Sequence, residues 1–287
     1  MWMTIQSVMK VAVVSTGLAM LAIPMVAQTY RAPRAEGGKP DLNGIWQSMN
    51  EANFDLEAHN ARSAMALRPG PYGPVPVAPV LALGAVGAVP PSMGVVEGGE
   101  IPYKPEGLKQ KKENQENWLA RDPEIKCYLP GVPRATYIPQ PFRIFESARQ
   151  IFIAYQFAGA VRNIYLKDPG PAPVDSWMGQ SVGHWEGETL VVDVTGFNDQ
   201  SWFDRAGNYH SDALHVIERY TAIGPDALQY EATIDDPKVF TRQWKMSMPL
   251  YRRMEKNAQL LEYKCVEFAE EVLYGHLRKQ PLKGDSK

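Results

Sequence analysis

Polar and aromatic side chains gather between residues 175 and 219, and two of them have the strongest potential for chemistry. Asp193 lies within a β-prone run, and His215 begins another run that reads as a strand. An enclosed carboxylate has a raised pKa, and an imidazole carries protons near neutral pH. If both face a sheltered interior, we expect them to act as general acid and base. The alternative is that each faces solvent or is paired for structural reasons.

The same region supplies further candidates for catalysis and binding. His184 and Asp204 are predicted to assist Asp193 or His215 in catalysis. A ligand pocket needs apolar walls with a few polar anchors. The ligand-binding candidates are Trp177, Trp185, Trp202, His210, Arg219 and, from an earlier strand, Tyr155. Aromatic residues at strand positions are usually plain core, and this alternative stays open.

Other kinds of site have no strong signature. The spacing of His184, His210 and His215 matches no standard zinc motif, so we predict no metal. Residues 179–183 match the GxSxG pattern, but neither the buried strand nor the helix that a nucleophile elbow requires flanks them. Glycine-rich phosphate loops are absent, and we expect no cofactor. With 30 basic against 32 acidic residues, the chain has no basic excess for a nucleic-acid partner.

The elements that position these residues are predicted to be β-strands. From Phe142 onward apolar residues recur at every second position, and His215 and Arg219 share one strand face while Glu218 lies on the other. Hairpins are expected within residues 151–166, 181–194, 214–235 and 243–265. A meander of about eight strands closes most readily into a barrel. The predicted fold class is therefore mainly β, an antiparallel meander forming a barrel or strongly curled sheet.

Two helices are expected outside the strands. Residues 105–118 are charged and free of internal proline, with Pro105 at the first position. After residue 265 the apolar residues fit one helical face, which predicts a short C-terminal helix packed on the sheet.

The sequence divides into a leader, a tether and a single β domain. Residues 1–28 read as a signal peptide, with Lys10 before an apolar run and a cleavage point before Gln28; an uncleaved anchor is the alternative. Residues 29–41 form a polar tether, and residues 42–280 the domain. Its Pro/Gly-rich insertion, residues 69–102, either covers an apolar surface or is poorly ordered. We expect the protein to be periplasmic or secreted, with no stable membrane span once the leader is cleaved. The sequence does not predict an oligomeric state.

Export also bears on the two cysteines, Cys127 and Cys265. An oxidising compartment favours a disulfide between them, which would tie together the two ends of the domain. Two unpaired buried thiols are the alternative.

Several motifs are similar to those of a widespread group of exported, largely uncharacterised bacterial proteins. They stand at residues 40–46 (PDLNGIW), 126–127, 131–134, 176–179 (SWMG), 185–193 (WEGETLVVD), 195–198, 213–220 (ALHVIERY) and 233–237. The resemblance spans most of residues 40–275 and implies export and a β fold, but no activity. The group often has a histidine where this chain has Gln180. In addition, Gly44-Ile45-Trp46 resembles the opening of lipocalin-like barrels.

Two functions are weighed on these grounds. The first is an envelope protein that binds a small, mostly apolar or aromatic ligand in a barrel pocket, with Asp193, His215 and Arg219 as polar anchors. The second is a cofactor-independent acid–base enzyme, a lyase, isomerase or hydrolase, that uses Asp193 and His215. An envelope interaction or structural protein is a third possibility, favoured if residues 69–102 form an exposed apolar arm.

Overall fold

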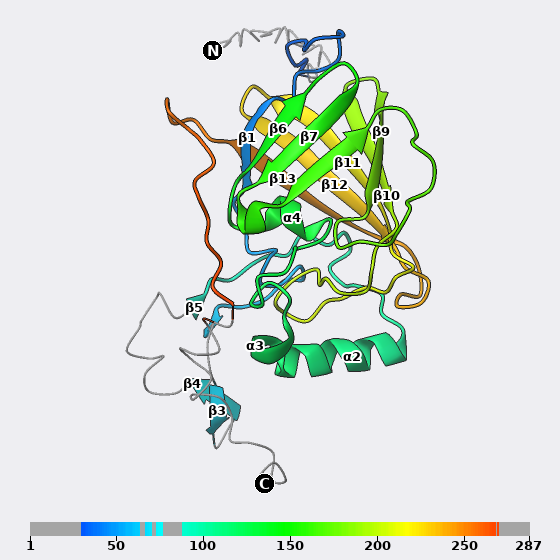
Figure 1. Ribbon diagram of the computed structural model, residues 1–287. Coiled ribbons are helices and arrows are strands. Elements are labelled where there is room, and N and C mark those ends of the chain that lie inside the picture. Colours follow the sequence, from blue (N-terminus) through cyan, green and yellow to red (C-terminus); the bar gives the residue numbers. More distant parts are fainter. Residues whose placement is uncertain (1–29, 64–66, 71–72, 77–87, 268, 270–287) are drawn as a thin grey trace, which may run out of the picture.

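The chain folds around a barrel of β-strands, shown in the computed structural model of Figure 1. The structure describes residues 30–63, 67–70, 73–76, 88–267 and 269. The barrel strands are β1 (Gly44–Ser48), β6 (Phe142–Glu146), β7 (Gln150–Tyr155), β8 (Val161–Tyr165), β9 (Gln180–Glu186), β10 (Thr189–Thr195), β11 (His215–Gly224), β12 (Ala227–Asp235) and β13 (Trp244–Arg252). Within the described residues they pair in a closed ring, β1-β13-β12-β11-β10-β9-β8-β7-β6. The predicted mainly β barrel is confirmed.

Alternating side chains explain how these strands enclose a core. In β12 every second residue from Leu228 to Ile234 is buried, and β11 shows the same pattern from Val216 to Ala222. Because successive side chains in a strand point to opposite faces, one set fills the interior and the other covers the outer wall. Tyr220 and Tyr230 stand opposite each other in register, with ring centroids 5.0 Å apart.

Three of the four expected hairpins are present, and the fourth is wrong. The confirmed hairpins are β7–β8, β9–β10 and β11–β12. β13 pairs with β12 on one side and β1 on the other, so residues 260–265 find no open edge and form no strand. The meander is also not wholly antiparallel. Residues 166–179 carry the chain back across the sheet, so β9 runs parallel to β8, which it meets through only two residue pairs.

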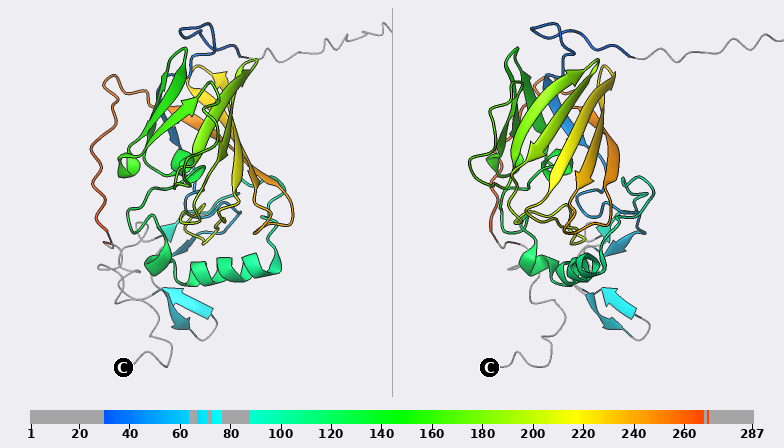
Figure 2. Two further views of the ribbon diagram at one scale, coloured as in Figure 1. Left: turned by 45° about the vertical axis from the view of Figure 1, so that its right-hand side comes forward. Right: turned by 90° about the vertical axis from the view of Figure 1, so that its right-hand side faces the viewer.

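Helices and small sheets gather at the lower end of the barrel as drawn in Figure 1. The expected first helix is present as α2 (Pro105–Glu116), which lies beneath the barrel and is followed by α3 (Trp118–Arg121). All four residues of α4 (Arg134–Tyr137) are buried, and η2 (Phe157–Gly159) turns β7 into β8. Two further two-stranded sheets pair β2 (Arg62–Ser63) with β5 (Ala88–Val89) and β3 (Leu67–Gly70) with β4 (Gly73–Pro76). Figure 2 shows β3 and β4 apart from the barrel.

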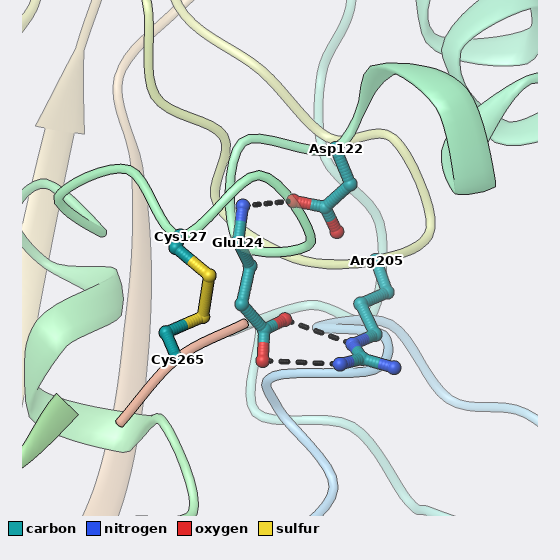
Figure 3. The surroundings of a disulfide bond; sticks show 5 residues. All are labelled: Asp122, Glu124, Cys127, Arg205 and Cys265. Atoms are coloured by element: carbon teal, nitrogen blue, oxygen red, sulfur yellow. Dashed lines mark hydrogen bonds and ion pairs between the residues drawn. A yellow bond between two sulfur atoms is a disulfide. The ribbon is translucent and has the colours of Figure 1, made fainter. Parts of the chain in front are cut away.

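A buried ionic network and a disulfide hold this lower end together (Figure 3). Arg134 pairs with Asp122 at 2.9 Å and with Glu124 at 2.7 Å. Arg205 also reaches Glu124 at 2.8 Å, as Figure 3 shows. Burial alone would raise the pKa of Glu124, but the guanidinium groups of Arg205 and Arg134 outweigh it and lower the pKa to about 2. Close by, Cys127 and Cys265 form the expected disulfide.

Several predicted segments fall outside the described residues. They are the leader, residues 1–28, nearly all of the expected C-terminal helix, and residues 71–72 and 77–87 of the Pro/Gly-rich insertion. Among the helices of the described ranges, none has the length and apolar character needed to cross a membrane.

Candidate functional site

Asp193 and His215 contact each other on the outer wall of the barrel. Nε2 of His215 lies 2.9 Å from Oδ2 of Asp193, and the two side chains are 36% and 49% exposed. The condition for acid–base chemistry in a sheltered interior is not met, because Val192, Val194 and Val216 occupy the inward positions of β10 and β11; the alternative, an outward-facing pair, holds. The pair therefore lies on a partly exposed face of the barrel wall.

Two more candidates, His184 and Arg219, lie on the same outer wall. Glu186 accepts a hydrogen bond from Nη1 of Arg219 at 2.9 Å, and its other oxygen lies 3.2 Å from Nε2 of His184. Hydrogen bonds from Arg219 and then from His184 lower the pKa of the Glu186 carboxyl. Ion pairs this exposed are weakened by water and salt. His184 also borders a pocket at the upper end of the barrel, whereas Arg219 does not line it.

Asp204 lies in the loop between β10 and β11 and is fully buried. It accepts hydrogen bonds from the backbone of Leu56 at 2.9 Å and from the side chain of Asn208 at 2.6 Å. Burial and the nearby charge of Asp55 raise the pKa of Asp204 to about 7. Its position ties two loops together at the base of the barrel and does not bring it to Asp193 or His215.

His210 forms a buried pair with a serine that the sequence analysis did not single out. Its Nδ1 lies 2.9 Å from the carbonyl oxygen of Ser211, which can only accept, so Nδ1 carries the proton. Nε2 therefore accepts from the Ser201 hydroxyl at 2.7 Å. Burial lowers the pKa of His210, which keeps the ring neutral. Both residues are only 2% exposed, so the pair is a satisfied, buried contact.

The six predicted ligand-binding residues do not form one site. Trp177 packs against Tyr128 at the lower end, with ring centroids 5.1 Å apart, and Trp202 is buried in the same region. His210 is also there, whereas Arg219 is on the outer wall, Trp185 at the upper end and Tyr155 in the interior. Their individual roles stay predictions.

An ionic cluster, which we call the interior cluster, occupies the middle of the barrel. Its members project inward from β7, β8, β11 and β12: Tyr155, Arg162, Glu218, Tyr220 and Tyr230. Arg162 pairs with Glu218, and its Nε donates to the Ser181 hydroxyl at 2.7 Å. The hydroxyls of Tyr220 and Tyr230 donate to Glu218 Oε1 at 2.9 and 2.8 Å. Both charged side chains are at most 2% exposed.

Two donors of the interior cluster remain without an acceptor. Nη1 of Arg162 and the hydroxyl of Tyr155 are buried and have no hydrogen-bond partner among the described residues. They are neighbours, because Arg162 stands opposite Ile153, two positions before Tyr155. Burial raises the pKa of Tyr155, so its hydroxyl keeps its proton. Arg162 and Thr136 are near enough to the Tyr155 hydroxyl for their hydrogen bonding to oppose the effect of burial on its pKa. The clearer deficit is therefore Nη1 of Arg162, and one unsatisfied buried donor costs about 1–3 kcal/mol.

A pocket of about 280 Å³, here called the rim pocket, opens at the upper end of the barrel. It is lined by Glu36, Gly37, Lys39, Glu146, Ser147, Ala148, Leu166, Gly183, His184 and Trp185. Nε1 of Trp185 is a further buried donor with no described partner. A Cβ at Gly183 would lie 2.6 Å from the side chain of Ile164, so only glycine fits between β8 and β9 at this level. The pocket therefore stands over the short parallel seam of the barrel.

Sequence reasoning missed Arg162 and gave Glu218 no role. The signal that reveals them is alternation, because Arg162 shares the inward set of β8 with Ile164, and Glu218 that of β11 with Val216 and Tyr220. A charged residue within an otherwise apolar set is expected only where a partner or ligand compensates it.

Comparison with protein-family models, curated proteins and solved structures finds no match for this chain. The resemblance to the exported bacterial group therefore rests on the motifs alone. Within the described residues, no group of three or more His, Cys, Asp or Glu side chains is placed to hold a metal ion.

Proposed function

We propose that this protein binds a small, mostly apolar molecule inside the barrel and anchors a neutral hydrogen-bond acceptor on that molecule. One observation carries the proposal: Arg162 Nη1 is buried without a described partner, and the Tyr155 hydroxyl beside it makes no well-formed hydrogen bond. A carbonyl, ester or ether oxygen between them would accept from both. The surrounding interior is apolar, with Ile153, Ile164 and Val192 among its fully buried side chains.

The charge of the interior cluster favours a neutral acceptor over an anion. Arg162 and Glu218 compensate each other, and the three tyrosines are uncharged because burial raises their pKa values. A carboxylate ligand would bring an uncompensated negative charge into a buried site, which costs several kcal/mol. A ketone or ester avoids that cost and still satisfies both donors.

The rim pocket is the proposed entrance. Leu166 and Gly183 line it, and Arg162, which projects inward from β8, lies four residues before Leu166, about 13 Å along an extended strand. Only two residue pairs join β8 to β9, so separating these two strands breaks the fewest backbone hydrogen bonds of the barrel wall. Trp185 would report on ligand entry through its fluorescence.

Export completes the proposal. A disulfide between Cys127 and Cys265 suits an oxidising compartment such as the periplasm or the exterior. An envelope or secreted protein with such a barrel would carry or sequester its ligand.

Binding is tested with matched ligands that share one apolar skeleton and end in a ketone, a methyl ester or a carboxylate. We expect the ketone and ester to raise the melting temperature and change tryptophan fluorescence, and the carboxylate to bind more weakly. Tyr155→Phe should weaken ketone binding about two- to tenfold, the worth of one hydrogen bond. The control is Tyr165→Phe on the outer face of the neighbouring strand, which should bind as the unaltered protein does.

Stability separates a lost ligand contact from damage to the fold. Because Tyr155→Phe removes an unsatisfied hydroxyl, its unfolding free energy without ligand should be unchanged or higher. A panel in which no ligand shifts the melting temperature, or a Tyr155→Phe variant with unchanged affinity, would overturn the proposal.

A further inference from the structure

A second pocket, of about 190 Å³, lies against β1 and is walled by arginines. We call it the arginine pocket. It is lined by Gly44, Ile45, Arg143, Arg252, Arg253 and Ala258, with no acidic residue among them. It shares no residue with the rim pocket or the interior cluster.

The register of three neighbouring strands brings the arginines together. Ile45 of β1 stands opposite Arg143 of β6, and its carbonyl accepts from the backbone N–H of Arg253, just after β13, at 2.8 Å. Trp46 stands opposite Arg252, whose guanidinium lies 4.2 Å from the centre of the indole ring. Guanidinium groups from both flanks of β1 therefore converge on one hollow.

Two of the arginines are held in place by other groups. Arg252 donates through Nη1 to the carbonyl of Asn43 at 2.7 Å and lies 3.5 Å from Asp226. Arg253 pairs with Glu255 at 2.5 Å. These contacts fix the orientation of the two guanidinium groups, while the two carboxylates stay outside the pocket lining.

Arg143 is the arginine of the pocket whose positive charge no described carboxylate compensates. Its side chain makes no ion pair or hydrogen bond with any residue that the structure describes, and it stacks over Phe145 at 4.6 Å. Three guanidinium groups against two carboxylates leave a formal charge of about +1 at the pocket.

Gly44 makes room for this arrangement. A Cβ at this position would lie 2.1 Å from Nη1 of Arg252, and its φ of 147° is one that favours glycine. A larger residue would push the guanidinium away from the backbone of β1. The glycine thus lets Arg252 reach the Asn43 carbonyl and border the pocket.

We propose that the arginine pocket binds an oxyanion of the phosphate class. A planar guanidinium offers paired N–H donors that match two oxygens of such a group, and several of them together neutralise its charge. Both a free phosphate and the phosphate of an anionic lipid headgroup present this chemistry. The site is independent of the proposed apolar ligand.

The test titrates the full-length protein with inorganic phosphate at low ionic strength, using calorimetry and amide NMR spectra. We expect the Gly44, Ile45 and Ala258 amide signals to shift with one common affinity. Arg143→Gln should weaken phosphate binding at least about tenfold, the worth of a charged hydrogen bond. The matched control is Arg149→Gln, an exposed arginine of the β6–β7 turn that lies outside the pocket. It makes the same change in net charge and should leave the affinity unaltered.

A second arm distinguishes the two sources of phosphate. Sedimentation with phosphatidylglycerol vesicles is compared with neutral phosphatidylcholine vesicles, again with both variants. Phosphate binding without vesicle binding identifies a free oxyanion, and vesicle binding that depends on Arg143 identifies a lipid headgroup. Equal losses in Arg143→Gln and Arg149→Gln would reduce the effect to net charge and overturn the proposal. The absence of binding in both arms would overturn it as well.

Discussion

The buried pair of Arg162 and Glu218 should dominate the response of the barrel to mutation. Glu218→Gln keeps a carbonyl oxygen for the hydroxyls of Tyr220 and Tyr230 but removes the negative charge that compensates Arg162. Breaking a buried ion pair from one side costs about 3–5 kcal/mol, because the remaining charge stays buried. This is a large part of the 5–15 kcal/mol that typically stabilises a domain. Arg162→Met should cost a similar amount for the same reason.

The double variant gives the decisive measurement. With both charges gone, the desolvation penalty disappears, so Arg162→Met with Glu218→Gln should be more stable than the sum of the single losses predicts by at least about 2 kcal/mol. Urea unfolding followed by circular dichroism supplies the four free energies. Glu186→Gln, which breaks the exposed pair with Arg219, is the control and should cause no measurable loss. Single losses that add to within about 0.5 kcal/mol would show that the two charges do not interact as argued.

Three further changes probe the lower end of the barrel. Reducing the disulfide, which joins residues 138 apart, should lower the unfolding free energy by up to about 5 kcal/mol; an unchanged urea midpoint in reductant would contradict this. In the folded protein the pKa of Asp204 is about 7, above its ordinary value of 3.8. The folded state therefore holds this proton more tightly, and the stability that results is full below about pH 4 and is lost as the pH rises through 7. The Asp204→Asn side chain cannot titrate, so the unfolding free energy of the wild type minus that of the variant should fall as the pH rises from 4 to 7. A difference that stays constant would refute the raised pKa of Asp204. Gly131→Ala would place a Cβ 2.2 Å from Ser201 Oγ. Gly187→Ala is the control, because its φ is also positive but no atom lies within 4 Å of the added Cβ. The loss of stability should be about 1–3 kcal/mol larger for Gly131→Ala than for Gly187→Ala. Equal losses in thermal melts would assign the whole effect to the backbone.

The barrel was predictable from the sequence because period-2 alternation and short turns are local signals. Which face of β10 points inward was not. On this strand Leu190 and Val192 fill the interior, yet Val191 on the outer wall is also only 4% exposed. With apolar residues on both faces, the pattern gives no sign of which side Asp193 occupies. The curvature of the whole sheet decides it, and that is a long-range property.

The interior cluster escaped prediction for a related reason. Arg162 and Glu218 are 56 residues apart, and β9 and β10 separate their strands in the barrel. Their side chains meet only across the closed interior, so no local sequence pattern predicts that they pair. The disulfide was easier, because with two cysteines in the chain there is only one way to pair them.

The place of β1 in the ring gives the barrel an order of assembly. β1 precedes all other barrel strands in the chain, yet it lies between β6 and β13. While a nascent chain has not yet reached β13, the sheet can curl but cannot seal, and unpaired backbone N–H and C=O groups remain on its border. A fragment that stops before Trp244 would keep that border permanently. Such a fragment would be prone to pair with other chains, so the last strand made is the one that covers the open border of the sheet.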